Sequence, residues 1–120
     1  MKTRNLTGAV LDWAVAKCEG AESAAACYYD IDGTPVRLDE AEYAEWQPTT
    51  NWAQGGAIIE REKISTTVDD SGVWVAYNKY NYAEEERYMQ TGATPLIAAM
   101  RCYVASQLGD EITLPQELTP

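Results

Sequence analysis

Histidine and phenylalanine are both absent from this chain, and each absence narrows what the protein can do. Without histidine, the chain lacks the commonest zinc ligand and the usual general base of enzymes. Without phenylalanine, its aromatic content rests on four Trp and eight Tyr. These side chains combine an apolar ring with a polar group, so they favour half-wet surroundings such as interfaces and ligand clefts.

Basic residues are also scarce, since nine Lys and Arg stand against nineteen Asp and Glu, and the net charge is −10. Proteins that follow nucleic-acid phosphates need a basic surface, and anionic membranes attract basic patches. The composition therefore predicts that neither a nucleic-acid polymer nor a membrane is the partner. It is compatible with a basic partner, with DNA mimicry or with simple solubility. Solubility is favoured, because the acidic residues are spread along the chain.

Cysteines number only three, without metal-site spacing, and long apolar runs are missing altogether. Met1 to Arg4 is not followed by the apolar core of a signal peptide. We therefore expect a soluble cytosolic protein with reduced thiols, no metal and no cofactor. A length of 120 residues suits one domain, which we predict to span residues 1–120.

Two helices are predicted, one near each end of the chain. The first begins after Thr7, a suitable N-cap, and ends at Gly20. The second begins after Thr94, carries Pro95 at its first position and ends at Gly109. The apolar spacing of the second helix predicts this buried stripe: Leu96, Met100, Tyr103, Val104 and Leu108.

Between the helices, turn residues separate short runs of strand-forming residues. Residues 24–29 and 35–38 predict one hairpin, and residues 64–68 and 73–77 predict another. Residues 39–46 are predicted to form a short helix or turn. Residues 58–62 are ambiguous between strand and helix, and residues 112–114 are predicted to form an edge strand. The predicted fold class is α+β, a small antiparallel sheet with two main helices.

A D-x-D-G-T motif occupies Asp30 to Thr34. In haloacid-dehalogenase-like phosphatases, such a motif supplies a nucleophile and an acid/base, and it follows the first strand of a doubly wound sheet. Here the strands do not alternate with helices, so a polar hairpin turn is the better interpretation. We therefore predict that the protein is not an enzyme and has no catalytic residues.

The segment from Pro48 to Gly56 combines an indole, carboxamides, hydroxyls and adjacent glycines. Trp supplies a flat apolar face, amides supply neutral donors and acceptors, and glycines let a backbone approach a ligand closely. The alternative is an elaborate structural turn. The predicted ligand-binding residues of the segment are Asn51, Trp52, Gln54, Gly55 and Gly56.

Two arginines and a group of tyrosines complete the candidate residues. Arg61 and Arg101 are predicted to hold a ligand phosphate, and the alternative is a structural ion pair, for example with Glu60 or Asp12. The stretch from 78 to 90 is predicted to be an exposed, tyrosine-rich excursion. A candidate interaction surface consists of Tyr77, Tyr80, Tyr82 and Tyr88.

Three blocks of the sequence resemble the NinX-like family, small tailed-phage proteins of unknown function. The first block is Leu11–Gly20, the second is Pro48–Gly56 followed by Ile58–Glu62, and the third is Gly92 followed by Thr94–Ser106 and Leu108–Glu111. Asn51 departs from the Asp usual in the family, and Ala57 and Ala93 stand where the family has Pro. The resemblance implies a phage accessory protein that acts in the cytoplasm of the host bacterium, and it implies no established activity.

These observations lead to two hypotheses of different class. In the first, the protein is a non-enzymatic anti-defence sponge that sequesters a nucleotide-derived immune signal, with Trp52 stacked on a base and the arginines on phosphate. A homo-oligomer would enclose such a ligand better than a monomer. In the second, the protein is an acidic inhibitor or adaptor that binds a host or phage protein.

Overall fold

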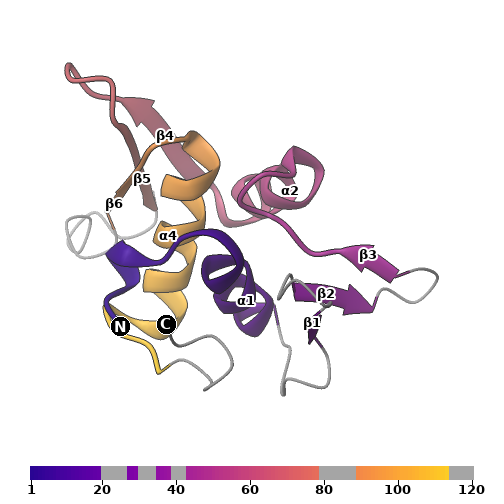
Figure 1. The fold of residues 1–120 in the computed structure, drawn as a ribbon. Coiled ribbons are helices and arrows are strands. Elements are labelled where there is room, and N and C mark those ends of the chain that lie inside the picture. Colours follow the sequence, from indigo (N-terminus) through magenta and orange to yellow (C-terminus); the bar gives the residue numbers. More distant parts are fainter. Residues whose placement is uncertain (20–26, 30–34, 39–42, 79–88, 114–120) are drawn as a thin grey trace.

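The computed structural model describes residues 1–19, 27–29, 35–38, 43–78 and 89–113 (Figure 1). Helices and antiparallel strands are both present, so the predicted α+β class is confirmed. The elements are η1 (Thr3–Asn5), α1 (Gly8–Cys18), β1 (Cys27–Tyr29), β2 (Pro35–Leu38), β3 (Tyr43–Glu45), α2 (Trp52–Glu62), β4 (Ile64–Val68), β5 (Trp74–Asn78), β6 (Gln90–Gly92) and α4 (Pro95–Leu108).

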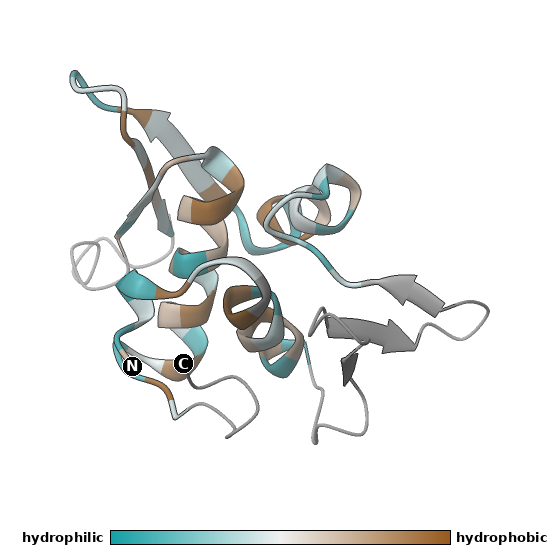
Figure 2. Cartoon of the chain, viewed as in Figure 1, coloured by the Kyte–Doolittle hydropathy of each residue, from teal (hydrophilic) through white to brown (hydrophobic). Residues whose placement is uncertain are grey.

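The C-terminal helix α4 is the centre of the fold, because α1, α2 and the β4–β6 sheet all pack against it (Figures 1 and 2). Its predicted boundaries are confirmed. The Thr94 hydroxyl accepts the N–H of Ile97 at 3.1 Å, Pro95 is the first helical residue, and Gly109 ends the helix with φ +89°. The buried residues of α4 are Leu96, Ala98, Ala99, Met100, Cys102, Tyr103, Val104 and Ala105.

Strands β4, β5 and β6 form an antiparallel sheet in that order, and the predicted second hairpin is confirmed. The Asp69 carboxylate closes the hairpin turn by accepting the N–H groups of Ser71 at 2.9 Å and Val73 at 3.0 Å. Strand β6 runs very close to α4, since a Cβ on Gly92 would lie 2.7 Å from the Ala98 nitrogen. Ile64 and Ala76 are buried on the face that meets the helix.

Strands β1, β2 and β3 form a second antiparallel sheet, which confirms the first predicted hairpin and corrects the segment after it. Residues 43–45, predicted as part of a short helix or turn, are a strand, because Leu38 pairs with Tyr43 and Val36 with Glu45. Such pairing partners come from elsewhere in the chain, so local propensity does not reveal them.

The largest correction concerns the segment from Pro48 onward, which contains a third helix, α2, over Trp52–Glu62. A smaller correction concerns residues 112 and 113, which form no strand. There the chain end is held by an isolated bridge between Lys2 and Glu111 and by the Ile112 N–H, which donates to the Met1 carbonyl at 3.0 Å. Among the described helices, none is long and apolar enough to cross a membrane.

Candidate functional site

Asn51 is the N-cap of α2, so the predicted binding segment is a turn followed by the start of a helix. Its side-chain oxygen accepts the N–H groups of Ala53 at 2.9 Å and Gln54 at 3.2 Å. These bonds satisfy backbone donors that the first turn of a helix cannot pair internally. Asn51, predicted from the sequence to bind a ligand, therefore holds the helix N-terminus.

The next predicted residues also make contacts within the fold. The Gln54 carboxamide oxygen accepts the Gln47 N–H at 2.7 Å, which ties the helix to the preceding turn. Gly55 is buried where α2 meets α4, and a Cβ there would lie 2.6 Å from Leu96 Cδ2 and would overlap the Pro48 carbonyl. Glycine at position 55 is therefore required by packing.

Trp52 is the exception, because 58% of this residue is exposed to solvent. The indole lies along the surface of α2 beside Gly56, where an added Cβ would be 3.7 Å from the ring. The other indoles described are buried at Trp13 and Trp46 and half-buried at Trp74. Trp52 is thus a large apolar group on the surface, and the fold does not use most of its area.

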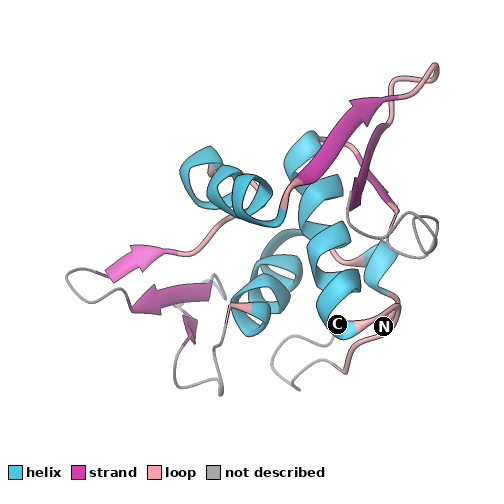
Figure 3. Ribbon diagram, turned by 180° about the vertical axis from the view of Figure 1, so that it is seen from behind, coloured by secondary structure: helices cyan, strands magenta, loops and turns pink. Residues whose placement is uncertain are grey.

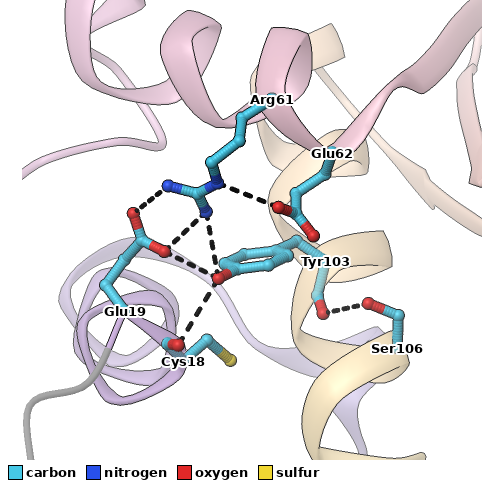
Figure 4. A network of polar contacts seen from close by, with 6 residues as sticks. All are labelled: Cys18, Glu19, Arg61, Glu62, Tyr103 and Ser106. Atoms are coloured by element: carbon cyan, nitrogen blue, oxygen red, sulfur yellow. Dashed lines mark hydrogen bonds and ion pairs between the residues drawn. The ribbon is translucent and has the colours of Figure 1, made fainter.

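Arg61, on the last turn of α2, belongs to a polar network that joins three helices (Figure 4). Its guanidinium donates to both Glu19 oxygens at 2.9 and 2.6 Å, to Glu62 at 2.9 Å and to the Tyr103 hydroxyl at 3.2 Å. The Tyr103 hydroxyl donates to Glu19 at 2.6 Å. The structural ion-pair alternative thus describes Arg61, although the partners are Glu19 and Glu62 rather than Glu60 or Asp12.

The network changes the acid–base properties of its members. Hydrogen bonds from Arg61 to Glu19 and Glu62 raise the pKa of the guanidinium further above its usual range. Burial, followed by the hydrogen bond to Glu19, raises the pKa of Tyr103 well above its ordinary value. Arg61 and Tyr103 therefore stay protonated, and the geometry is that of a stable ionic contact between helices.

Arg101 is held in a different place and by a different kind of partner. Its Nε donates to the Leu6 carbonyl at 2.8 Å, and a terminal nitrogen donates to the Thr91 carbonyl at 2.8 Å. Burial lowers the pKa of its guanidinium. Arg101 therefore ties α4 to the chain that leads into α1 and to strand β6.

The predicted ligand-binding residues do not converge on one point. Arg61 follows Trp52 by nine residues, which places the two side chains about 180° apart around α2 and about 13 Å apart along its axis. Arg101 bonds to Thr91 on β6, which lies on the far side of α4 from α2 (Figures 1 and 3). The binding of a ligand by any of these residues remains a prediction.

The other sequence candidates fall partly within the described residues. Tyr77 lies half-buried on β5, whereas Tyr80, Tyr82 and Tyr88 lie outside the described residues. The D-x-D-G-T motif also lies outside them, but β1 and β2 on either side of it pair in antiparallel fashion. Within the described part of the chain, no three His, Cys, Asp or Glu side chains form a group that fits a metal ion.

Asp12, which was not among the site residues predicted from the sequence, is a buried carboxylate. It is 4% exposed, and one carboxylate oxygen accepts the Thr49 N–H at 3.0 Å, while its backbone carbonyl accepts the Trp46 indole N–H at 2.9 Å. Burial raises the pKa of Asp12 to about 6, although hydrogen bonds from Thr49 oppose the rise. The sequence signal was its helical spacing to the apolar Val15 and Ala16.

These features define a small α+β protein in which two helices and a sheet surround α4, with an exposed indole on α2. The chain belongs to the family described as "Bacteriophage P22, NinX", whose sequence model matches residues 2–107. The resemblance deduced from the sequence is therefore confirmed. No curated protein matches the chain.

Proposed function

We propose that this protein is a non-enzymatic phage accessory protein that acts in the host cytoplasm by binding another protein through Trp52. The observation that carries the proposal is the 58% exposure of this indole on a helix whose neighbouring residues are fixed by packing and capping. Exposed tryptophans on rigid elements are typical anchors of protein interfaces, because they bury a large area at low entropic cost.

The charge of the chain supports a protein partner with a basic surface. A net charge of −10 attracts such a surface and repels phosphate-bearing ligands. The two arginines expected to hold phosphate are engaged elsewhere, Arg61 by Glu19 and Glu62 and Arg101 by two carbonyls. For Arg61 to bind a phosphate in a bidentate manner, its bidentate contact with Glu19 would have to open.

The experiment is affinity capture from lysates of phage-infected bacteria, with wild type, Trp52→Ala and Met89→Ala as baits. Met89 is the matched control, because it is another large apolar residue with 45% exposure. We expect one stoichiometric partner with wild type and Met89→Ala, and its loss with Trp52→Ala. Equal capture by the three baits, or no partner with any of them, would contradict the proposal.

A second candidate function, the anti-defence sponge for a nucleotide-derived signal, is favoured by the same exposed ring. A flat indole can stack on a base of any identity, and Gly56 beside it has no side chain that would obstruct the ring. Calorimetric titration with cyclic nucleotides and ADP-ribose derivatives tests it. Binding that Trp52→Ala abolishes would favour the sponge, whereas no heat with any of them would exclude these ligands.

A further inference from the structure

We infer that the outer edge of β4 is a self-association surface, on which a second copy of this chain pairs its own β4 in antiparallel fashion about Thr66. This inference goes beyond the proposed function and does not depend on it. Strand β4 is an edge strand, since the order in its sheet is β4-β5-β6. In Figures 1 and 3, the β4–β5 hairpin projects beyond the end of α4.

The hydrogen-bond pattern shows which backbone groups of β4 point outward. The Asp69 N–H donates to the Val73 carbonyl at 2.9 Å, so this pair is hydrogen-bonded within the hairpin. Such pairs alternate along an antiparallel ladder, and the register then makes Ser65 and Thr67 the next residues bonded to β5. The N–H and C=O groups of Ile64, Thr66 and Val68 therefore face away from β5.

This alternation suits a two-fold pairing centred on Thr66. Thr66 then faces its own copy, and Ile64 of each chain faces Val68 of the other. Each of these residues presents its backbone groups outward, so every opposed pair can exchange both of its N–H···O bonds. A register shifted by one residue would instead oppose backbone groups already bonded to β5.

The side chains of β4 allow this contact in a strongly acidic protein. All five, from Ile64 to Val68, are uncharged, although the chain as a whole carries −10. Lys63 and Asp69 flank the strand, so the two-fold axis places Lys63 of one copy near Asp69 of the other. Val68, 51% exposed in the single chain, would lie opposite Ile64 of the second copy, and because the Ile64 side chain is itself buried, the contact there is made by the backbone groups.

The strand also lacks the usual protections of an exposed edge. Edge strands are commonly blunted by an inward charge, a proline, a bulge or very short length. Over its described residues, β4 has none of the first three, and it pairs with β5 without interruption over five residues. The opposite edge of the sheet is β6, which is only three residues long.

The test is sedimentation velocity over a concentration series, with wild type, Thr66→Pro and Thr66→Ala. Proline removes an N–H that faces outward, so it breaks the pairing between copies without removing a bond to β5. Thr66→Ala keeps the N–H and is the matched control. We expect wild type and Thr66→Ala to form dimers and Thr66→Pro to remain monomeric. A wild type that stays monomeric, or a Thr66→Pro that dimerises equally well, would overturn the inference.

Amide hydrogen exchange of the wild type gives an answer even if Thr66→Pro fails to fold. The Ser65 and Thr67 amides should be protected at every protein concentration, because they bond to β5. The Thr66 and Val68 amides should become protected only as the concentration rises. Thr66 and Val68 amides that exchange equally fast at all concentrations would overturn the inference, whatever partner Trp52 binds.

Discussion

Gly55 and Gly56 are adjacent in α2, yet the structure constrains them differently. A Cβ at Gly55 would overlap the Pro48 carbonyl and come within 2.6 Å of Leu96, whereas a Cβ at Gly56 would meet only the Trp52 ring, at the ordinary distance of 3.7 Å. We expect Gly55→Ala to destabilise the fold by about 2 kcal/mol or more, because backbone cannot move aside cheaply. Gly56→Ala should stabilise it by up to about 1 kcal/mol through helix propensity.

Urea denaturation of the two variants beside wild type measures these changes directly. Opposite signs would support packing as the reason for Gly55. Equal effects of the two substitutions would contradict packing as the reason for Gly55.

A second prediction at the scale of single residues concerns Asp12, whose burial raises its pKa from 3.8 to about 6. The native state therefore favours the protonated form, so the stabilisation is fully present below about pH 4 and is lost as the pH rises through 6. The difference in unfolding free energy between wild type and Asp12→Asn should fall by about 2 kcal/mol between pH 4 and pH 7.

Denaturation of both proteins at each pH provides the measurement, and the difference between them removes the contribution of the other titrating groups. A difference that stays constant over this pH range would contradict the raised pKa. The hydrogen bond from the Thr49 N–H opposes the effect, so it also sets how far the pKa can rise.

At the scale of elements, the contact of Glu19, Arg61 and Tyr103 fixes how α1, α2 and α4 lie against one another. Tyr103→Phe removes the hydroxyl that donates to Glu19 at 2.6 Å. We expect a loss of about 1 kcal/mol, or more if the Glu19 carboxylate is left short of donors. The measurement is again urea denaturation.

Tyr77→Phe is the matched control for that substitution. Tyr77 lies on β5, and its hydroxyl makes no hydrogen bond with the described part of the chain. It should leave the unfolding free energy nearly unchanged. If the two substitutions cost the same, the contact between the three helices does not contribute to stability.

The elements also show why some of the fold follows from the sequence and some does not. The ends of α4 were predictable, because Thr94, Pro95 and Gly109 act within one or two turns of their own helix. The start of α2 was missed, although Asn51 is a recognisable N-cap, because Gly55 and Gly56 lower helix propensity, and its end, residues 58–62, was left open between strand and helix. The requirement for Gly55 comes from Pro48 and Leu96, and sequence alone does not show that α4 lies there.

At the scale of the whole molecule, some features of the candidate site also follow from the sequence and others do not. The sequence made Trp52, Arg61 and Arg101 candidates for one site, but it did not show that they lie on different faces of the fold. Their placement follows from the packing of α2 and β6 on α4. Glu19, which pairs with Arg61, is 42 residues away in sequence, and no local pattern connects the two.

The net charge of −10 and the exposed indole lead to one account of the molecule, in which Trp52 is proposed as the anchor for a partner protein. The most direct test is calorimetric titration of the captured partner into wild type, Trp52→Ala and Met89→Ala, with melting temperatures checked first. The account predicts that Trp52→Ala weakens the Kd by about thirtyfold or more, the loss expected of an interface hot spot, while Met89→Ala binds like wild type. A Trp52→Ala protein that melts like wild type and binds the partner with the same Kd would contradict it.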